Sequence, residues 1–322
     1  FAGNSDQQVG TANASGISEA ARQAIVGRCN YDYAGKYLAE FSFRYDGSSN
    51  FPAGNRWGFF PAVSAGWRIS EEAFIKGNDK LSFIENLKLR ASYGKMGDDG
   101  DAKYQFVTGY DYPNTEGGTN DKYPTGYSFG GAYTNSLGFR SVPNPNITWY
   151  TVKTLNIGLD ADFWNGLFGI TFELFKRDRS GLLADRLSTV PGTFGSTMPK
   201  ENLNSDRTKG FELELRHSNK INDFRYNVSG QIAMTRGMRC YYETNPAGNS
   251  YDYWRNRNLD RWNDIWFGYG AAGRYTSYEQ IYNSIYSSTS TLPGDYIYQD
   301  WNGDGVIDGM DMHPIATTTN PT

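Results

Sequence analysis

Apolar and polar residues alternate along several stretches of this chain. The clearest case is "KYLAEFSFRYDG", residues 36–47, in which every second side chain is apolar. Successive side chains of a β-strand point to opposite faces of a sheet, so alternation with a period of two indicates a strand with one apolar and one polar face. In this stretch the apolar face would carry the following residues: Tyr37, Ala39, Phe41, Phe43 and Tyr45.

The same alternation recurs along the first two thirds of the chain and predicts a series of strands. They are expected near residues 22–33, 37–46, 57–68, 87–94, 150–163, 168–177, 209–217 and 223–236. Residues 70–86 suggest one short helical turn within a longer connection. Beyond residue 236 the chain is loop-like, with one more strand expected around 264–276.

The lengths of the connections separate two architectures that would both satisfy this pattern. A soluble sandwich turns its apolar face inward, whereas a membrane barrel turns it outward to lipid and lines its lumen with the polar face. The links "WNGLFG" (164–169) and "SNKIND" (218–223) are short, while those over about 94–150 and 178–208 are long. Outer-membrane barrels alternate long external loops with tight periplasmic turns, so the pattern favours an all-β, antiparallel transmembrane barrel segment with long extracellular loops.

Composition agrees with a β-structure and argues against several other classes. The chain has 322 residues with 37 Gly, 24 Tyr and 19 Phe, but only 38% hydrophobic residues. Aromatic residues favour strands and glycines favour turns. The formal net charge of −4 argues against a nucleic-acid partner, which would require a basic face. The chain contains no run of 18 apolar residues, so no membrane-spanning helix is predicted. Cys29 and Cys240 form no CxxC unit, so we interpret them as two free or buried thiols; a disulfide between them is the alternative.

Residues that could perform catalysis are scarce. The two histidines, His217 and His313, have no partner at the spacing of a zinc site. Carboxylate pairs such as Asp160/Asp162 and Glu212/Glu214 fall on the polar face of a predicted strand. Glycosidases use such a pair, but acids two positions apart are also expected on a water-filled lumen wall. The sequence therefore predicts no enzyme.

Two loop-like stretches are rich in the side chains that bind sugars and peptides. Residues 110–135 and 240–258 are crowded with Tyr, Asn, Asp and Gly. Aromatic rings stack on sugar faces and amides hydrogen-bond to hydroxyls, but the same residues also stiffen long surface loops. Both interpretations remain open, and no individual binding residue is predicted.

The stretch "DWNGDGVIDGMD", residues 300–311, has the spacing of a calcium loop. Oxygen-bearing side chains occupy its first, third, fifth, ninth and twelfth positions, and Gly305 is the sixth. Neither flank predicts the helices of an EF-hand. We expect one structural calcium ion that holds an external loop in shape; the alternative is an Asx-rich turn that orders itself without metal. The expected ligands are Asp300, Asn302, Asp304, the carbonyl of Val306, Asp308 and Asp311.

Particular phrases in the chain carry a resemblance to a known protein family. They include "FSFRYDGSSNFPAGNRWGFFPAVSAGWRIS", "LKLRASYGKMGDDG", "TLNIGLDADFWNG", "ELFKRDRSGLL", "NSDRTKGFELEL" and "PGDYIYQDWNGDGVIDGMD". The most specific phrases lie near residues 41–68, and the agreement continues through the calcium-like loop. In these phrases the chain resembles the SusC/RagA family of TonB-linked outer-membrane transporters of Bacteroidetes-type bacteria. The resemblance implies a large barrel whose lumen is filled by a plug domain.

On this basis residues 1–322 are expected to be part of a TonB-dependent receptor barrel domain. Strands would lie mainly within 22–236 and about 264–276, with 277–322 largely an extracellular loop. The plug domain and the closing strands would lie outside this chain. A barrel with missing strands leaves unpaired backbone groups in lipid, so we expect that the segment alone neither inserts nor transports.

The resemblance also implies a function and partners. The function would be uptake of nutrients, either oligosaccharides or peptides, across the outer membrane, with binding-driven gating and no covalent chemistry. The implied partners are a SusD-like lipoprotein lid and the TonB energy-coupling complex acting on the plug. The alternative from another class is a secreted or surface β-rich carbohydrate-binding module with calcium-stapled loops. Dependence on detergent would separate the two.

Overall fold

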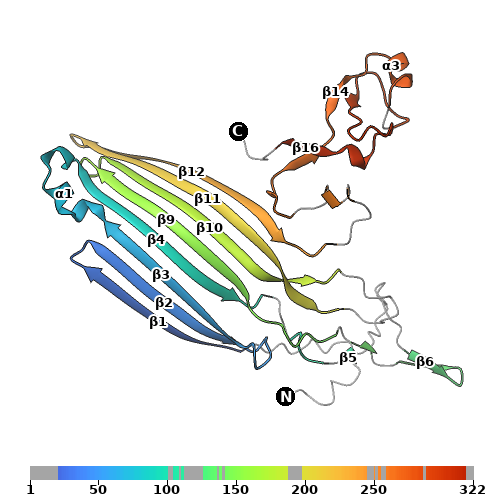
Figure 1. Ribbon diagram of the computed structural model, residues 1–322, viewed down its shortest axis with the longest axis horizontal. Helices are drawn as coiled ribbons and strands as arrows, with labels where there is room; N and C mark the ends of the chain where they lie inside the picture. The colour runs from blue at the N-terminus through green and yellow to red at the C-terminus, as the bar shows by residue number, and fades with distance from the viewer. Residues whose placement is uncertain are drawn as a thin grey trace. The chain divides into compact units, whose positions relative to one another are not determined.

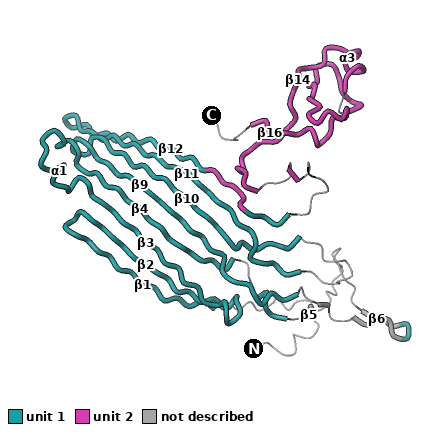
Figure 2. Tube along the Cα trace, viewed as in Figure 1, with its two compact units in different colours: residues 1–235, 241–245 teal, residues 236–240, 246–322 magenta. Residues whose placement is uncertain are grey.

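The computed structural model divides the chain into two compact units. Contacts group residues 1–235 with 241–245, and residues 236–240 with 246–322 (Figure 2). The described parts of the chain contain no helix that is long and apolar enough to cross a membrane. The described residues are 21–100, 104–108, 110–111, 126–135, 138–139, 142–187, 198–244, 250, 253–254, 259–285 and 288–316.

The first unit is built on an eight-stranded antiparallel sheet (Figure 1). Its strand order is β1-β2-β3-β4-β9-β10-β11-β12, so every long strand lies beside the long strand that precedes it in the chain. This up-and-down arrangement confirms the predicted antiparallel all-β fold. The strands are β1 (Arg22–Tyr33), β2 (Tyr37–Ser48), β3 (Trp57–Arg68), β4 (Ile84–Asp98), β9 (Tyr150–Phe163), β10 (Phe168–Asp185), β11 (Lys200–Ile221) and β12 (Phe224–Tyr241).

The two ends of this sheet differ in their connections. At one end the turns are short, and positive φ angles at Ala34 (55°) and Gly35 (65°) form the tight link between β1 and β2. The β3–β4 connection at this end contains the predicted helical turn (Figure 1), as η1 (Ile69–Glu71), α1 (Ala73–Lys76) and η2 (Asp79–Leu81). At the other end, here called the long-loop end, β4 connects to β9 and β10 to β11 through much longer segments. Short strands pair within the first of these: β5 (Tyr110–Asp111) with β8 (Gly138–Phe139), and β6 (Gly126–Phe129) with β7 (Ala132–Asn135).

Strand register places the alternating apolar residues on one face of the sheet, here called the apolar face. Phe41 lies opposite Val63, Val63 opposite Tyr93, and Tyr93 opposite Leu155 across four successive strands. These side chains remain exposed, at 42% for Phe41 and 48% for Tyr93. An exposed apolar surface that continues across neighbouring strands is what a lipid-facing wall requires.

The fully buried apolar residues of the first unit lie at the long-loop end. Phe51 and Ile147 are both 0% exposed and pack with partly buried neighbours. Those neighbours are Phe106, Trp149 and Leu183. This small core therefore joins connections to strand ends, and does not lie beneath the centre of the sheet.

The second unit contains short strands that pair over long sequence distances. β13 (Trp266–Gly268) pairs with β16 (His313–Ala316), and β14 (Ala271–Arg274) pairs with β15 (Tyr296–Tyr298). The single strand expected over 264–276 is thus divided between two ribbons. The unit also contains α3 (Tyr278–Tyr282) and the turn η4 (Gly309–Asp311).

Candidate functional site

The polar face of the sheet, opposite the apolar face, carries a ladder of ion pairs. Arg90 on β4 donates to Asp160 on β9 at 3.1 Å and also to Glu173 on β10. Asn156 donates to the second oxygen of Glu173 at 3.0 Å. Hydrogen bonds between arginine and carboxylate groups are charge-assisted and short, so this face presents fixed, paired charges.

The predicted acid pair Asp160/Asp162 lies on this polar face, as its alternation indicated. Its two members bind different cations: Asp160 pairs with Arg90, whereas Asp162 accepts from Arg216 at 2.9 Å. Asn86 also donates to Asp162, at 3.2 Å. Each of the two acids is therefore held in its own ion pair, as expected for structural residues on the polar wall of a sheet.

The polar face is hollowed next to this ladder. An open recess of about 530 Å³ spans strands β1 to β4 and β9. Its wall presents both charged and neutral polar groups to the space above it, among them Arg28, Glu40, Ser64, Lys88, Arg90 and Asn156. Groups of this kind can hydrogen-bond to a polar solute or to another protein segment.

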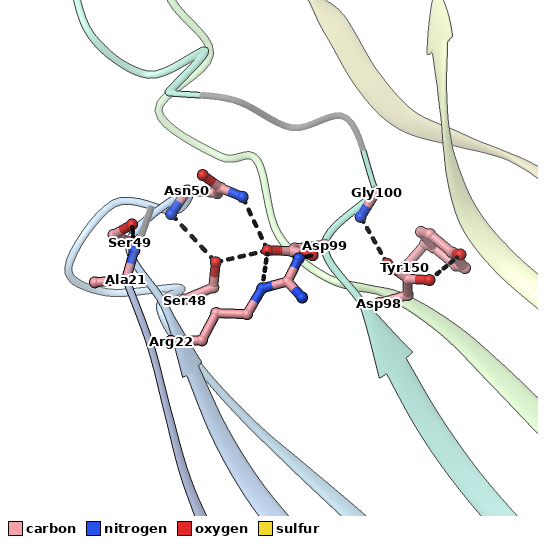
Figure 3. A network of polar contacts seen from close by, with 9 residues as sticks. All are labelled: Ala21, Arg22, Ser48, Ser49, Asn50, Asp98, Asp99, Gly100 and Tyr150. Carbon is pink, nitrogen blue, oxygen red and sulfur yellow. Dashed lines mark hydrogen bonds and ion pairs between the residues drawn. The ribbon is translucent and has the colours of Figure 1, made fainter. Parts of the chain in front are cut away.

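A buried carboxylate fastens three segments at the long-loop end (Figure 3). Asp99 is 3% exposed and lies directly after β4. It accepts from Arg22 at the start of β1 (2.5 Å), from Ser48 at the end of β2 (2.7 Å) and from Asn50 (2.8 Å). A buried carboxylate with several donors is satisfied and holds its surroundings in one arrangement.

The Asp99 network did not follow from the sequence. Its partners are 49 to 77 positions away from Asp99 in the chain. The local signal is only an acid in "GDDG", which suits a turn equally well. Register between distant strands brings these residues together, and register is not visible in a single stretch.

A second recess lies at the same end, beside two aromatic rings. The ring of Phe60 meets that of Trp149 edge-on, with centroids 5.4 Å apart. The adjoining space of about 720 Å³ also borders charged and flexible side chains, which include Arg22, Arg44, Asp46 and Met96. The combination of rings with fixed charges is suited to contacts with an amphipathic solute.

The Asp300–Asp311 loop is ordered by hydrogen bonds from its own backbone. Asp300 accepts from the N–H groups of Gly303 (2.7 Å) and Gly305 (2.8 Å). Asp304 accepts from Val306 N–H at 2.8 Å. Gly303 and Gly305 have φ angles of 74° and 84°, a region that glycine adopts without strain. Both glycines therefore shape the turn, although the calcium-loop spacing marked only Gly305.

Asp311, the twelfth position of this loop, faces inward. It is 0% exposed and accepts from the N–H groups of Trp301 and Asp308, each at 2.8 Å. Asp308 in turn caps the turn η4 by accepting from Met310 N–H at 2.7 Å. Within the described residues, no group of three or more His, Cys, Asp or Glu side chains is placed to hold a metal ion. The loop oxygens point to backbone amides in this conformation, although each still has lone pairs for a cation.

Little of the two aromatic loop stretches belongs to the part of the chain that the structure describes. Most of 110–135 and much of 240–258 lie outside the described residues. His313, by contrast, is described and stacks on Trp301, with ring centroids 3.9 Å apart. Its Nδ1 lies 3.0 Å from the carbonyl oxygen of Asp311, so it belongs to the loop's polar network.

Comparison with protein families yields a match over nearly the whole chain. The family model described as "TonB dependent receptor-like, beta-barrel" matches residues 2–310. The chain is 27% identical over 318 residues to TonB-dependent receptor P3 of Formosa agariphila, covering 94% of the chain and 30% of that protein. It is 29% identical over 300 residues to TonB-dependent receptor SusC of Bacteroides thetaiotaomicron, covering 89% of the chain and 27% of SusC. The chain thus spans less than a third of the length of these curated relatives.

A solved structure shows the same fold. The RagAB peptide importer in its closed-closed state superposes with a TM-score of 0.65 at 17% identity, covering 93% of this chain and 30% of that one. At this identity the similarity concerns the fold. The up-and-down sheet of this chain therefore has the fold of part of that solved structure.

Proposed function

Because the chain belongs to the TonB-dependent receptor β-barrel family, in its SusC/RagA group, we propose that it forms part of the barrel wall of an outer-membrane transporter that takes up oligosaccharides or peptides. Members of this family reside in the outer membrane and are receptors and transporters rather than enzymes. Uptake is then a matter of binding and gating, and we assign no catalytic residue.

One observation carries this proposal: the two faces of the sheet differ in chemistry along eight consecutive strands. Apolar side chains such as Phe41 and Ile157 are 42% and 43% exposed on one face. On the other face Arg90, Asp160 and Glu173 form linked ion pairs. A membrane barrel needs this division between a lipid side and an aqueous lumen, whereas a soluble binding module would bury its apolar face.

The side chains on the polar face favour a polar solute as the cargo. Its open recess beside Arg90 offers hydrogen-bonding groups, and the recess at the long-loop end adds the rings of Phe60 and Trp149. Sugars and peptides both present polar groups next to apolar surfaces, so both classes fit these walls. SusC and the RagAB peptide importer are the relatives that motivate the two candidates.

Two partners belong to the proposal. The first is a SusD-like lipoprotein that closes over the long-loop end as a lid. The second is the TonB energy-coupling complex, which would act through a plug in the lumen. Both are proposed from the family, because the contacts they would need involve the full-length receptor. Binding of cargo would favour a closed arrangement, and energy from TonB would release it inward.

Deletion of the full-length receptor in its host tests the proposal. We expect loss of growth on one class of nutrient, oligosaccharide or peptide, and restoration when the intact gene is returned. Dissipating the proton gradient should stop uptake while leaving binding of the same labelled cargo at the cell surface. Unchanged growth on both classes, or uptake that continues without the gradient, would overturn the transport proposal.

Location and the lid have separate readouts. The receptor should appear in the outer-membrane fraction and require detergent for extraction, and a lipoprotein should co-purify with it. A receptor that is soluble without detergent would instead support the secreted calcium-stapled binding module. Co-purification without a lipoprotein would remove the lid from the proposal and leave the barrel wall unaffected.

We also propose that the Asp300–Asp311 loop binds one structural calcium ion. The spacing of its oxygen-bearing side chains supports this, together with the positive φ angles at Gly303 and Gly305 that curl the chain around a centre. Binding would require Asp300 and Asp304 to turn free lone pairs toward the ion while keeping their amide hydrogen bonds. The ion would hold the loop in shape and would take no part in transport.

A further inference from the structure

The apolar face of the sheet ends in a group of cationic side chains at the long-loop end. The group is formed by four lysines and one arginine on four neighbouring strands, and we call it the cationic cluster. It consists of Lys95 on β4, Lys153 on β9, Lys176 on β10, and Arg207 and Lys209 on β11. Neither the alternation of the sequence nor the family match points to it.

Strand register shows that these residues share a face with the apolar ones. In one row across the strands, Tyr93 lies opposite Leu155, Leu155 opposite Lys176, and Lys176 opposite Lys209. In the next row toward the long-loop end the order is Lys95, Lys153, Asp178 and Arg207. Neighbouring strands lie about 4.8 Å apart, so the four strands bring these charges within roughly 15 Å of one another.

The cluster has a large excess of positive charge. Asp178 is the one carboxylate in these two rows, and it is already occupied by Lys176 (3.1 Å) and Arg207 (2.5 Å). Lys95, Lys153 and Lys209 form no ion pair with any residue that the structure describes. The chain as a whole has a formal net charge of −4, so general basicity does not explain the cluster.

The position of the cationic cluster relative to the apolar rows defines its depth in the membrane. On β9 the apolar face runs from Phe163 to Leu155, and the following residue on that face is Lys153. A tilted strand crosses the hydrocarbon core in about 9–11 residues, so Lys153 falls where hydrocarbon gives way to headgroups. The long loops of such barrels face outward, which places the cluster in the outer leaflet.

We propose that the cationic cluster binds the phosphate groups of a phosphorylated lipid headgroup in the outer leaflet. Several ammonium groups and one guanidinium at headgroup depth complement such phosphates in charge, and each contributes to attraction near a membrane surface. The apolar rows directly below would contact the acyl chains of the same lipid. This inference relies on the apolar face meeting lipid and is independent of the cargo.

A lipid-binding measurement on the full-length receptor in detergent tests the proposal. The probe is lipid A that carries its phosphates, compared with the same lipid after enzymatic removal of the phosphates. We expect Lys153→Gln/Lys209→Gln to weaken binding of the phosphorylated lipid about 10- to 30-fold, since each cation near a surface contributes about 1 kcal/mol. Lys153→Arg/Lys209→Arg should retain most of the affinity because it keeps both charges.

A matched control uses two lysines at the other end of the sheet. Lys80 and Lys220 are exposed as Lys153 and Lys209 are, and Lys80→Gln/Lys220→Gln removes the same charge. This control should leave lipid binding unchanged. Equal weakening by both double variants would mean that net charge alone matters, and would overturn the site.

Two further measurements on the unmodified receptor need no substitution. Raising sodium chloride from about 0.05 to 0.5 M should weaken binding of the phosphorylated lipid, because salt screens exposed charges. Inorganic phosphate alone at millimolar concentration should not compete with the lipid. Equal binding of the dephosphorylated lipid, or full competition by inorganic phosphate, would overturn the proposal of a lipid headgroup site.

Discussion

At the scale of single residues, the ring of Phe60 occupies space that glycines leave open at the long-loop end. A Cβ atom placed on Gly58 or Gly97 would overlap the Phe60 ring. The ring is 5% exposed and also contacts Trp149. These glycines therefore serve close packing, since a side chain at either position would displace the ring.

We expect Gly97→Ala to destabilise the receptor by about 1–3 kcal/mol, because it overpacks a site that is already filled. Thermal unfolding of the purified receptor in detergent would measure the change. In the double variant Phe60→Leu/Gly97→Ala, leucine takes less space than the phenylalanine ring. Part of the lost stability should therefore be recovered, as expected for two residues in direct contact.

Gly230→Ala on β12 is the control for this pair, since a Cβ there meets no atom within 4 Å. It should leave the unfolding temperature nearly unchanged. Equal effects of the Gly97 and Gly230 substitutions would show that loss of glycine itself, and not the Phe60 contact, determines stability.

At the scale of elements, alternation located the eight long strands but not their full lengths. The strand expected over 168–177 extends to Asp185, and the one expected over 209–217 begins at Lys200. Past the lipid belt the outward positions become polar, as Lys176 and Asp178 are, so the alternation disappears while backbone pairing continues. The periodicity of the sequence therefore indicates which face of a strand is apolar, whereas the ladder of backbone hydrogen bonds determines where the strand ends.

The functional groups divide in the same way. Alternation correctly placed Asp160 and Asp162 on the polar face, but their partners Arg90 and Arg216 follow from register. The Asp99 network and the cationic cluster also assemble from separate strands. Local patterns indicate the face of a residue, whereas its neighbours depend on pairings between positions far apart in the chain.

Glu72, in the connection between β3 and β4, fastens the short-turn end of the sheet. It accepts hydrogen bonds from Tyr37 (2.7 Å), Trp67 (3.1 Å) and Lys36 (3.2 Å). The bond from Tyr37, followed by that from Trp67, lowers the pKa of the Glu72 carboxyl below its ordinary value of 4.5. The ionised form is therefore favoured by folding.

The stabilisation from Glu72 should depend on pH in a defined direction. Because folding lowers this pKa, the contribution is fully present above the ordinary glutamate value and is lost as pH falls through the lowered folded-state pKa. We expect the unfolding temperature of the native receptor to exceed that of Glu72→Gln at neutral pH, with the difference shrinking as the pH falls below about 4.5. A constant difference between pH 7 and pH 3 would contradict this account.

The calcium prediction for the Asp300–Asp311 loop can be tested by calorimetry on the full-length receptor. Extracellular calcium sites bind with dissociation constants of about 10⁻⁴–10⁻³ M, and Asp311 is shorter than the usual glutamate, so we expect affinity in this range. Asp300→Asn/Asp304→Asn should abolish the binding heat, whereas Asp223→Asn in a short turn should not. An ordered loop with no binding heat at millimolar calcium would mean that its amide hydrogen bonds suffice.

At the scale of the whole molecule, the proposed transporter requires one face of this sheet to meet lipid. The nine positions from Leu155 to Phe163 on β9 provide a direct test, because Leu159 lies at their centre and Leu155 at their border. An arginine on the lipid face costs about 2–4 kcal/mol at the midplane and about 0–1 near the interface. We therefore expect Leu159→Arg to destabilise the receptor in a bilayer much more than Leu155→Arg does.

Comparing two positions on one face of one strand removes strand propensity and side-chain type as explanations. Thr154→Arg, on the polar face of the same strand, supplies the control for an added charge that meets water, and should cost little. A sheet whose apolar face met water instead of lipid would tolerate arginine at Leu155 and Leu159 about equally. The gradient of cost with depth, measured by unfolding in lipid vesicles, thus distinguishes a membrane wall from a surface that is merely apolar.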